Sequence, residues 1–351
     1  MKNSVIILLI ALFFASCGEN TDKQNDKSSA DSVAKADMAL LEKAKTVFAT
    51  LPEVAENPDN KITDAKVKLG KILYFDNRLS FKETQSCNTC HNLSTFGVDN
   101  LPTSPGDNGG LGPRNSPTVL NSAIQKVQFW DGRAKDVEEQ AGMPVTNPVE
   151  MAMPDEAFVI NRLSKVEAYK KMFTEAFPED ANSLTFENLK KAIGAFERTL
   201  MTTDRFDKFL NGDLTALNSQ EKKGLETFMN KGCTACHSGA GLGGDLMMKF
   251  GIHKDYTEVI DSVKTDEGLY ALTKEDKDMF VFRTSALRNV EKTYPYFHDG
   301  SVKSLKEAVK IMAITELGQE LTDAETDDIV AFLSTLTGDL SEEVKTAPEI
   351  P

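Results

Sequence analysis

The pentapeptide Cys-x-x-Cys-His occurs twice in this chain of 351 residues, and no other feature restricts the possible folds as strongly. One copy occupies residues 87–91 and the other residues 233–237. Four of the five cysteines belong to these motifs, and the fifth is Cys17 near the start of the chain. The sequence therefore has no cysteines left over for the disulfide framework that is common in exported proteins.

The residue types in this motif suit the covalent attachment of haem. Two thiols can bond to the vinyl groups of a haem, and the adjacent histidine can then reach the iron. A zinc site would need further cysteine or histidine ligands nearby, but the chain has only four histidines and two of them lie inside the motifs. A thioredoxin-like dithiol would need a βαβ context, which we do not find, and a disulfide would not require the histidine. We expect two c-type haems, attached through Cys87, Cys90, Cys233 and Cys236, with His91 and His237 as iron ligands.

The first 17 residues have the features of an export signal. Residues 5–14 form an apolar run that is too short to span a bilayer, and the segment ends at Cys17 after small residues. This pattern resembles a bacterial lipoprotein signal, and the alternative is a plain secretory signal with an incidental cysteine. We expect a protein of the periplasm or cell envelope, held by lipid on Cys17, with the outer membrane as the favoured membrane. Residues 18–37 are polar and are expected to form a flexible tether.

About 300 residues remain, a length that favours two domains. Apolar residues recur at helical spacing in residues 38–51, 187–200 and 321–338, and no series of alternating strands appears. We expect an all-α fold of two cytochrome-c-like haem domains with long loops and with the haems either side of a domain interface. The expected boundaries are an N-terminal domain at 38–205, a C-terminal domain at 206–338 and a loose tail at 339–351.

A small residue and an aromatic residue four positions apart precede each haem motif. Gly70 and Tyr74 come before the first, and Gly224 and Phe228 before the second. Residues at this spacing share one helix face, so the pairs predict a repeated helix contact in the two domains. Thr322 and Glu325 have the spacing of a capping box and predict a helix start.

The net charge of −14 argues against a nucleic-acid partner, because binding to phosphates needs a basic surface. An acidic face could instead steer a basic donor protein toward the chain.

Two blocks outside the haem motifs are distinctive. Phe-Trp-Asp-Gly-Arg and Asn-Pro-x-Glu-Met lie between the motifs, and Pro-Tyr-Phe-His-Asp-Gly follows the second. In this order, from Asp64 to Gly338, the chain resembles the bacterial dihaem cytochrome c peroxidase family, which also includes the MauG-type enzymes. The resemblance implies reduction of hydrogen peroxide to water at a low-potential first haem. Electrons from a small c-type cytochrome or another periplasmic donor would enter at a high-potential second haem, and the family pattern suggests a homodimer.

The resemblance also implies roles for single residues. Met312 falls where the family places the sixth ligand of the second haem, and a thioether opposite histidine raises a haem potential. MauG-type enzymes place tyrosine there, and by itself Met312 could be an ordinary core residue of a helix. Glu150 matches the family's catalytic acid, which can move a proton during peroxide cleavage, and Gln140 matches a polar neighbour in the same pocket.

Further matches concern the region between the domains. Trp130 matches a tryptophan between the haems, where it could conduct electrons or simply fill space. Asn115, Thr293 and Pro295 match a calcium site made of one side-chain oxygen and two carbonyl oxygens.

The remaining predictions concern a cation and two histidines. Arg288 is expected to contact a haem propionate. We expect His298 to be a structural hydrogen-bonding residue and His253 to be an exposed loop residue.

One departure from the family pattern affects the mechanism. Many members carry a histidine after the first motif that caps the peroxidatic iron until the other haem is reduced. Here residues 92–113 contain no His, Met, Cys, Lys or Tyr, and Asp99 and Asp107 are poor haem ligands. We therefore expect an open first haem unless a distant residue such as His253 replaces the cap.

Two other functions remain alternatives at this point. The first is a MauG-like oxidase that acts on a protein or organic substrate. The second is a dihaem electron carrier or redox sensor without enzymatic activity, against which Glu150 in an intact motif argues.

Overall fold

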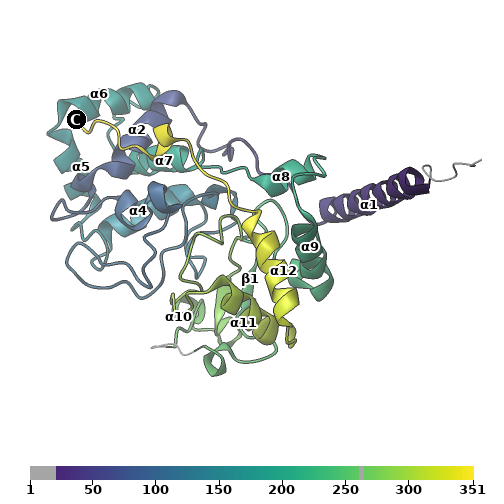
Figure 1. Ribbon diagram of the computed structural model, residues 1–351. Helices are drawn as coiled ribbons and strands as arrows, with labels where there is room; N and C mark the ends of the chain where they lie inside the picture. The colour runs from purple at the N-terminus through teal and green to yellow at the C-terminus, as the bar shows by residue number, and fades with distance from the viewer. Residues whose placement is uncertain (1–20, 261–264) are drawn as a thin grey trace, which may run out of the picture.

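The computed structural model describes residues 21–260 and 265–351, so the predicted signal segment and Cys17 lie outside the described residues (Figure 1). Helices dominate the described chain and β1 pairs with β2 in a small antiparallel sheet, which confirms the expected all-α fold. The helices are α1 (Thr21–Lys45), α2 (Asp64–Phe75), α3 (Cys87–Cys90), α4 (Val137–Thr146), α5 (Glu156–Ser164), α6 (Glu167–Ala176), α7 (Phe186–Glu197), α8 (Arg205–Leu210), α9 (Ser219–Lys231), α10 (Tyr270–Thr273), α11 (Leu305–Leu317), α12 (Asp323–Ser334) and α13 (Glu342–Lys345). The strands are β1 (Met247–Lys249) and β2 (Val281–Arg283).

The first lobe is built around the crossing of α2 and α7. A Cβ added at Gly70 would lie 1.9 Å from the carbonyl oxygen of Ala192, so the two backbones touch at this point. One turn further along, Tyr74 packs edge-on against Phe196 with ring centroids 5.4 Å apart.

The second lobe repeats this crossing with α9 and α12. A Cβ at Gly224 would lie 1.8 Å from the carbonyl oxygen of Asp328, and the rings of Phe228 and Phe332 are 5.5 Å apart. Each lobe has its own buried cluster around its crossing. The prediction from the glycine–aromatic pairs is therefore confirmed: the same helix–helix contact occurs in both lobes. The predicted capping box at Thr322 is also confirmed at the start of α12.

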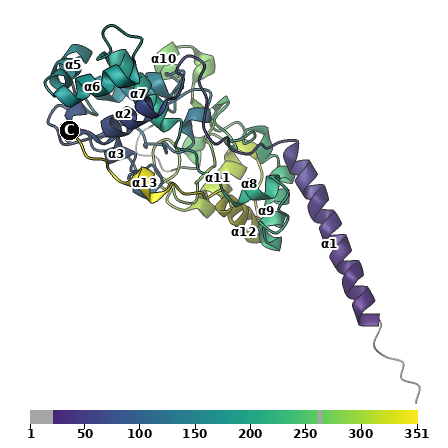
Figure 2. The ribbon, with the colours of Figure 1, turned by 90° about the horizontal axis from the view of Figure 1, so that it is seen from above.

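The segment expected to be a tether is helical in the structure. Helix α1 runs from Thr21 to Lys45 and projects away from the body of the molecule (Figure 2). The segment contains no proline or glycine and many good helix formers, so its composition does not oppose helix formation. The C-terminal part of α1 is anchored in the second lobe, where Leu41 and Ala44 are buried in the core. The N-terminal domain was expected to begin at residue 38, but Leu41 and Ala44 belong to the core of the second lobe.

The tail beyond residue 338 was expected to be loose, but it returns to the first lobe (Figure 1). Leu340 is buried in the first core, with Val344 and Ile350 packed beside it. At the end of the chain Arg78 Nη2 donates to the Pro351 carbonyl oxygen at 2.6 Å. A few apolar residues at intervals are thus enough to dock the tail across the two lobes.

Candidate functional site

A cavity of about 810 Å³ contains the first haem motif. Residues from both lobes line it, because His298 and Asp299 of the second lobe face residues of the first. The sequence predictions converge here: the lining includes Cys87, Cys90, His91, Trp130, Gln140 and Glu150.

His91 follows α3 directly, at the C-terminal end of its single turn. Its Nδ1 lies 3.0 Å from the carbonyl oxygen of Pro117, a geometry in which Nδ1–H donates and Nε2 is left as the free metal-binding nitrogen. The hydroxyl of Tyr74 donates to the His91 carbonyl oxygen at 2.5 Å and ties the motif to α2. Burial lowers the pKa of His91 and so favours the neutral imidazole that a metal ion requires.

His237 has an equivalent arrangement in the second lobe. Its Nδ1 lies 3.1 Å from the carbonyl oxygen of Leu242, which again leaves Nε2 free. The loop that supplies this oxygen passes very close to its neighbours, since a Cβ at Gly243 would lie 2.2 Å from the Ser285 carbonyl oxygen. Gly243 also has a φ of +127°, which only glycine tolerates readily.

The residues around the first motif fit a haem. Cys87 and Cys90 are free thiols that line the cavity beside His91. Four buried polar atoms of the lining have no partner among the described residues: Ser122 Oγ, Glu197 Oε2, His298 Nε2 and Asp299 Oδ2. Buried polar groups are normally paired, so these atoms point to a group with polar edges in the cavity.

Glu150 lies in the turn that follows α4, and the same cavity contains Gln140 from that helix. Its Oε1 accepts a hydrogen bond from Asn147 Nδ2 at 3.0 Å. Burial raises the pKa of Glu150, while the positive charge of Arg133 and the bond from Asn147 oppose the shift. The carboxyl group is thus suited to hold a proton. Sequence reasoning missed Asn147, although the Asn-Pro-x-Glu string contains it.

The loop after His91 is held by its own carboxylates. Asp107 accepts hydrogen bonds from the Thr84 hydroxyl at 2.6 Å and the Lys82 amide at 2.7 Å. Asp99 accepts from the amide of Leu101 and the hydroxyl of Ser104. Neither Asp99 nor Asp107 lines the cavity. Both carboxylates therefore shape the loop, as expected if neither serves as a haem ligand.

Trp130 joins the two lobes at the edge of the cavity. Its Nε1 donates to the Asn115 carbonyl oxygen at 2.9 Å, and its own carbonyl oxygen accepts from the Arg283 amide at 2.7 Å. Its ring meets that of His298 edge-on at 6.3 Å. These contacts explain a structural role, and conduction through Trp130 stays a prediction.

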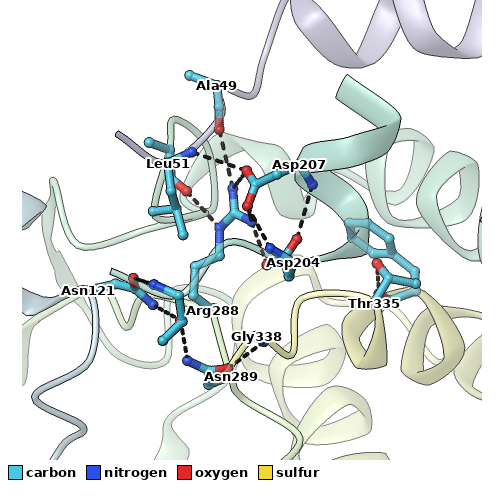
Figure 3. A network of polar contacts seen from close by, with 12 residues as sticks. Ala49, Leu51, Asn121, Asp204, Asp207, Arg288, Asn289, Thr335 and Gly338 are labelled. Atoms are coloured by element: carbon cyan, nitrogen blue, oxygen red, sulfur yellow. Dashed lines mark hydrogen bonds and ion pairs between the residues drawn. The ribbon is translucent and has the colours of Figure 1, made fainter. Parts of the chain in front are cut away.

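Arg288 does not have the role expected for it (Figure 3). Its guanidinium donates to Asp204 at 2.6 Å, to Asp207 at 2.9 and 3.0 Å, and to the carbonyl oxygens of Ala240 and Ala49 at 2.9 and 3.3 Å. These five bonds use all five N–H groups of the side chain. The structure corrects the prediction, because two buried carboxylates neutralise Arg288 and leave no donor for a propionate: Asp204 at the N-cap of α8 and Asp207 within that helix.

Arg283, five residues before Arg288, is a buried cation that forms no ion pair with any described residue. Its side chain is 4% exposed, its Nε donates to the Phe129 carbonyl oxygen at 3.2 Å, and its Nη1 has no partner among the described residues. Burial lowers the pKa of Arg283 to about 10. A buried charge without a counter-ion is costly, so this guanidinium fits an anionic group that is not part of the chain.

The two remaining histidines have different surroundings. His298 is buried and its ring stacks on Phe282 at 4.3 Å, while its backbone oxygen accepts from the Asn115 amide at 2.7 Å. It joins the lobes as expected, but its ring does so by packing, since Nε2 has no partner among the described residues. His253 is exposed beside the end of α11 and does not line the cavity. It therefore has the expected loop position.

The structure leaves two further ligand predictions open. Met312 is half-buried on α11, and its ligation of the second haem stays a prediction. Among the described residues no cluster of three or more His, Cys, Asp or Glu side chains could hold a metal ion. The predicted calcium ligands Asn115, Thr293 and Pro295 would supply an amide oxygen and carbonyls, so this finding does not concern them.

Comparison with known proteins agrees with the site. A model of the di-haem cytochrome c peroxidase family matches residues 64–215, and a cytochrome c model matches residues 221–337. The cytochrome c551 peroxidase of Pseudomonas aeruginosa is 46% identical over 89% of this chain and 90% of its own length. The chain belongs to the dihaem cytochrome c peroxidase family. The cytochrome c551 peroxidase of Nitrosomonas europaea is 42% identical over 86% of each chain.

MauG-type members of the family are more distant. The methylamine utilization protein MauG of Methylophilus methylotrophus is 32% identical over 82% of this chain and 86% of its own length. Among solved structures, a MauG-like protein associated with microbial copper homeostasis superposes with a TM-score of 0.74 at 28% identity, over 85% of this chain and 95% of that one. Family membership implies two cytochrome c domains with covalent c-type haems.

Proposed function

We propose that this protein reduces hydrogen peroxide to water with two electrons from a small periplasmic c-type cytochrome. The first haem would be attached to Cys87 and Cys90 and bound by His91, and the second to Cys233 and Cys236 and bound by His237. The observation that carries the proposal is the placement of Glu150 and Gln140 in the same cavity as the first haem motif.

The first haem, when bound, supplies the electron-transfer chemistry of the reaction, and the chain supplies the proton handling. Glu150 can take a proton from peroxide and return it to the departing oxygen, which is the help expected of a positioned carboxylate. Asn147 fixes the orientation of that carboxylate through its 3.0 Å bond. Gln140 adds an amide that can hold the substrate in the pocket.

Electrons would enter at the second haem, with Met312 as its sixth ligand and a higher potential as the consequence. Arg283 replaces Arg288 as the proposed partner of a haem propionate. The support is its buried position, its free Nη1 and the absence of any ion pair to it among the described residues.

The sixth position of the first haem is proposed to be open in the oxidised protein. Residues 92–113 hold no strong haem ligand, and Asp107 is occupied by Thr84 and Lys82. The oxidised enzyme would then react with peroxide without prior reduction.

Location and assembly are also proposals. None of the helices that the structure describes is both long and apolar enough to cross a membrane. An exported lipoprotein, anchored through Cys17 to the outer membrane, would place the enzyme in the cell envelope beside a soluble donor. One calcium ion at Asn115, Thr293 and Pro295 and a homodimer complete the proposal.

A peroxidase assay with a reduced small cytochrome c distinguishes the three functions. We expect peroxide-dependent oxidation of the donor, at similar initial rates with and without pre-reduction of the enzyme. A dihaem carrier or sensor would accept electrons from the donor without consuming peroxide. A MauG-like oxidase would consume peroxide only with its organic or protein substrate present.

A further inference from the structure

The two helix crossings place different residues against the two haem sites. Phe196 and Phe332 occupy equivalent positions in the repeated contact, one turn after the close approach to Gly70 or Gly224. The next residue is Glu197 in the first lobe and Leu333 in the second. Both are buried, with 4% and 3% of their surface exposed. A carboxyl group thus occupies a core position that the second lobe fills with a hydrocarbon.

No cation of the described residues forms an ion pair with Glu197. The neighbouring Arg198 is engaged by Glu138, with Nε and Nη2 each donating to one carboxylate oxygen at 2.7 Å. Glu197 Oε2 is buried without a partner among the described residues, and the residue lines the cavity of the first haem motif. A buried, unpaired carboxylate is costly, because the loss of hydration on burial destabilises the folded state at any pH where the group is ionised.

Charged and titratable groups from α2, α3 and α4 surround Glu197, together with Arg198 beside it in the chain. The pKa of Glu197 is raised to about 8: burial is the largest cause, the charge of Glu138 on α4 acts in the same direction, and the charge of Arg198 opposes them. Burial also raises the pKa of the Cys87 thiol, with the Glu197 charge adding to the effect. The pKa of the Tyr74 hydroxyl on α2 is raised as well, first by burial, then by the charge of Cys87 and then by that of Glu197. As a haem thioether Cys87 would not titrate, so the acid would face the haem through a neutral sulfur.

We propose that Glu197 binds and releases a proton in step with the oxidation state of the first haem. When an electron arrives from the second haem, the iron loses one positive charge and the Glu197 carboxylate takes up one proton from solvent to become the acid. Loss of the electron reverses both events. The net charge of the site then stays constant, which removes the Coulomb cost of changing a charge in a buried cavity. The inference rests on the proposed attachment of the first haem in this cavity, but not on peroxide reduction.

The sign of the effect follows from the charges. A ferric iron stabilises the carboxylate more than a ferrous iron does, so the pKa of Glu197 is lower in the oxidised state. Between these two pKa values the reduction potential of the first haem falls as pH rises. One proton for each electron corresponds to about 59 mV for each pH unit, since a tenfold change in proton concentration changes the equilibrium constant tenfold. Leu333 offers no such proton to the second haem.

Spectroelectrochemical titration of the holoprotein from about pH 6 to pH 9 tests this proposal without peroxide. Both potentials are read in the same sample, so the second haem is the internal reference. We expect the first-haem potential of the wild type to depend on pH, and E197Q to abolish most of that dependence. E197Q should also raise the first-haem potential at high pH, where the wild-type carboxylate would stabilise the ferric iron.

Two variants serve as matched controls. E150Q removes a second carboxyl group from a cavity that Asp131, Asp266, Glu267 and Asp299 also line, and it should leave the slope in place. L333Q adds a polar side chain of similar size to the second lobe and should create no slope there. If E197Q does not fold, infrared difference spectra of the wild type and E150Q replace it. A carboxylic acid carbonyl band that appears in both on reduction of the first haem supports the proposal.

Three results would overturn the proposal. They are a pH-independent first-haem potential in the wild type, a slope that persists in E197Q, and a carbonyl band that is missing from the wild type. None of them bears on the peroxidase assignment, because that assignment depends on Glu150 and on turnover.

Discussion

The two lobes share a scaffold and differ in what surrounds the haem motif. Each crosses two helices through a glycine and an aromatic pair, and each directs its motif histidine with a backbone carbonyl at Nδ1. The first lobe then adds Glu150, Gln140 and Glu197 around a cavity, while the second has Leu333 at the position of Glu197 and offers Met312 from α11. Under the proposed function, the side chains placed around a shared haem-binding unit make the first lobe the reaction site and the second lobe the electron relay.

Removing the attachment cysteines has the largest expected effect. Changing Cys87 and Cys90 to alanine should remove the first haem, and the same change at Cys233 and Cys236 should remove the second. Each pair would be the covalent link to the haem of one lobe only. Mass spectrometry of the denatured chain counts the haems, and a wild-type chain that carries zinc and no haem would contradict the account.

The next comparison concerns proton transfer in the first lobe. E150Q keeps the size of the side chain but removes its acid function, so we expect peroxidase turnover to fall about a hundred- to ten-thousand-fold. Both haem spectra should stay intact. E167Q is the matched control, since Glu167 is an exposed acid on α6 paired with Lys170. Near-normal turnover in E150Q would move the proton role to Gln140 or to water.

Met312 tests the second lobe in the same way. M312H replaces a thioether with an imidazole, which should lower the potential of the second haem sharply and leave the first unchanged. The oxidised wild type should also show the weak near-infrared band of histidine–methionine iron. Unchanged potentials in the variant, together with the absence of that band, would refute the assignment.

The shared scaffold predicts a smaller and symmetrical effect. Alanine at Gly70 or Gly224 would place a Cβ less than 2 Å from a carbonyl oxygen of the facing helix, so the crossing must open. We expect each change to lower the free energy of unfolding by about 1–3 kcal/mol, the usual cost of overpacking. G110A is the control, because its Cβ would meet only Val149 Cγ1 at 3.9 Å. Thermal unfolding that ranks all three variants alike would show that the crossings are not tightly packed.

The sequence predicted the parts of the molecule that depend on local patterns. The haem motifs, the glycine–aromatic spacing and the capping box at Thr322 each involve residues a few positions apart. The roles of Arg283 and Arg288 could not be separated in this way, because both lie in one short string. Only the fold brings Asp204 and Asp207 to Arg288, and it gives Arg283 no anionic partner within residues 21–260 and 265–351.

Contacts at long range account for the other differences. The tail docks because Leu340 meets a core formed by residues far earlier in the chain, and α1 is anchored by Leu41 in the second lobe. Glu197 gave no signal in the sequence, since an acid after an apolar helix residue usually faces solvent. Its position becomes informative only when the two helix crossings are compared, because Leu333 occupies the equivalent place in the second lobe.

Electron paramagnetic resonance of the fully oxidised protein tests the central claim most directly. The claim is that the two haems share their attachment and differ in the sixth position, because the loop after His91 has no competing ligand and Asp107 is held by Thr84 and Lys82. We predict one high-spin ferric signal from the first lobe and one low-spin signal from the second. Two low-spin signals, with a lag in turnover that only pre-reduction abolishes, would contradict the account.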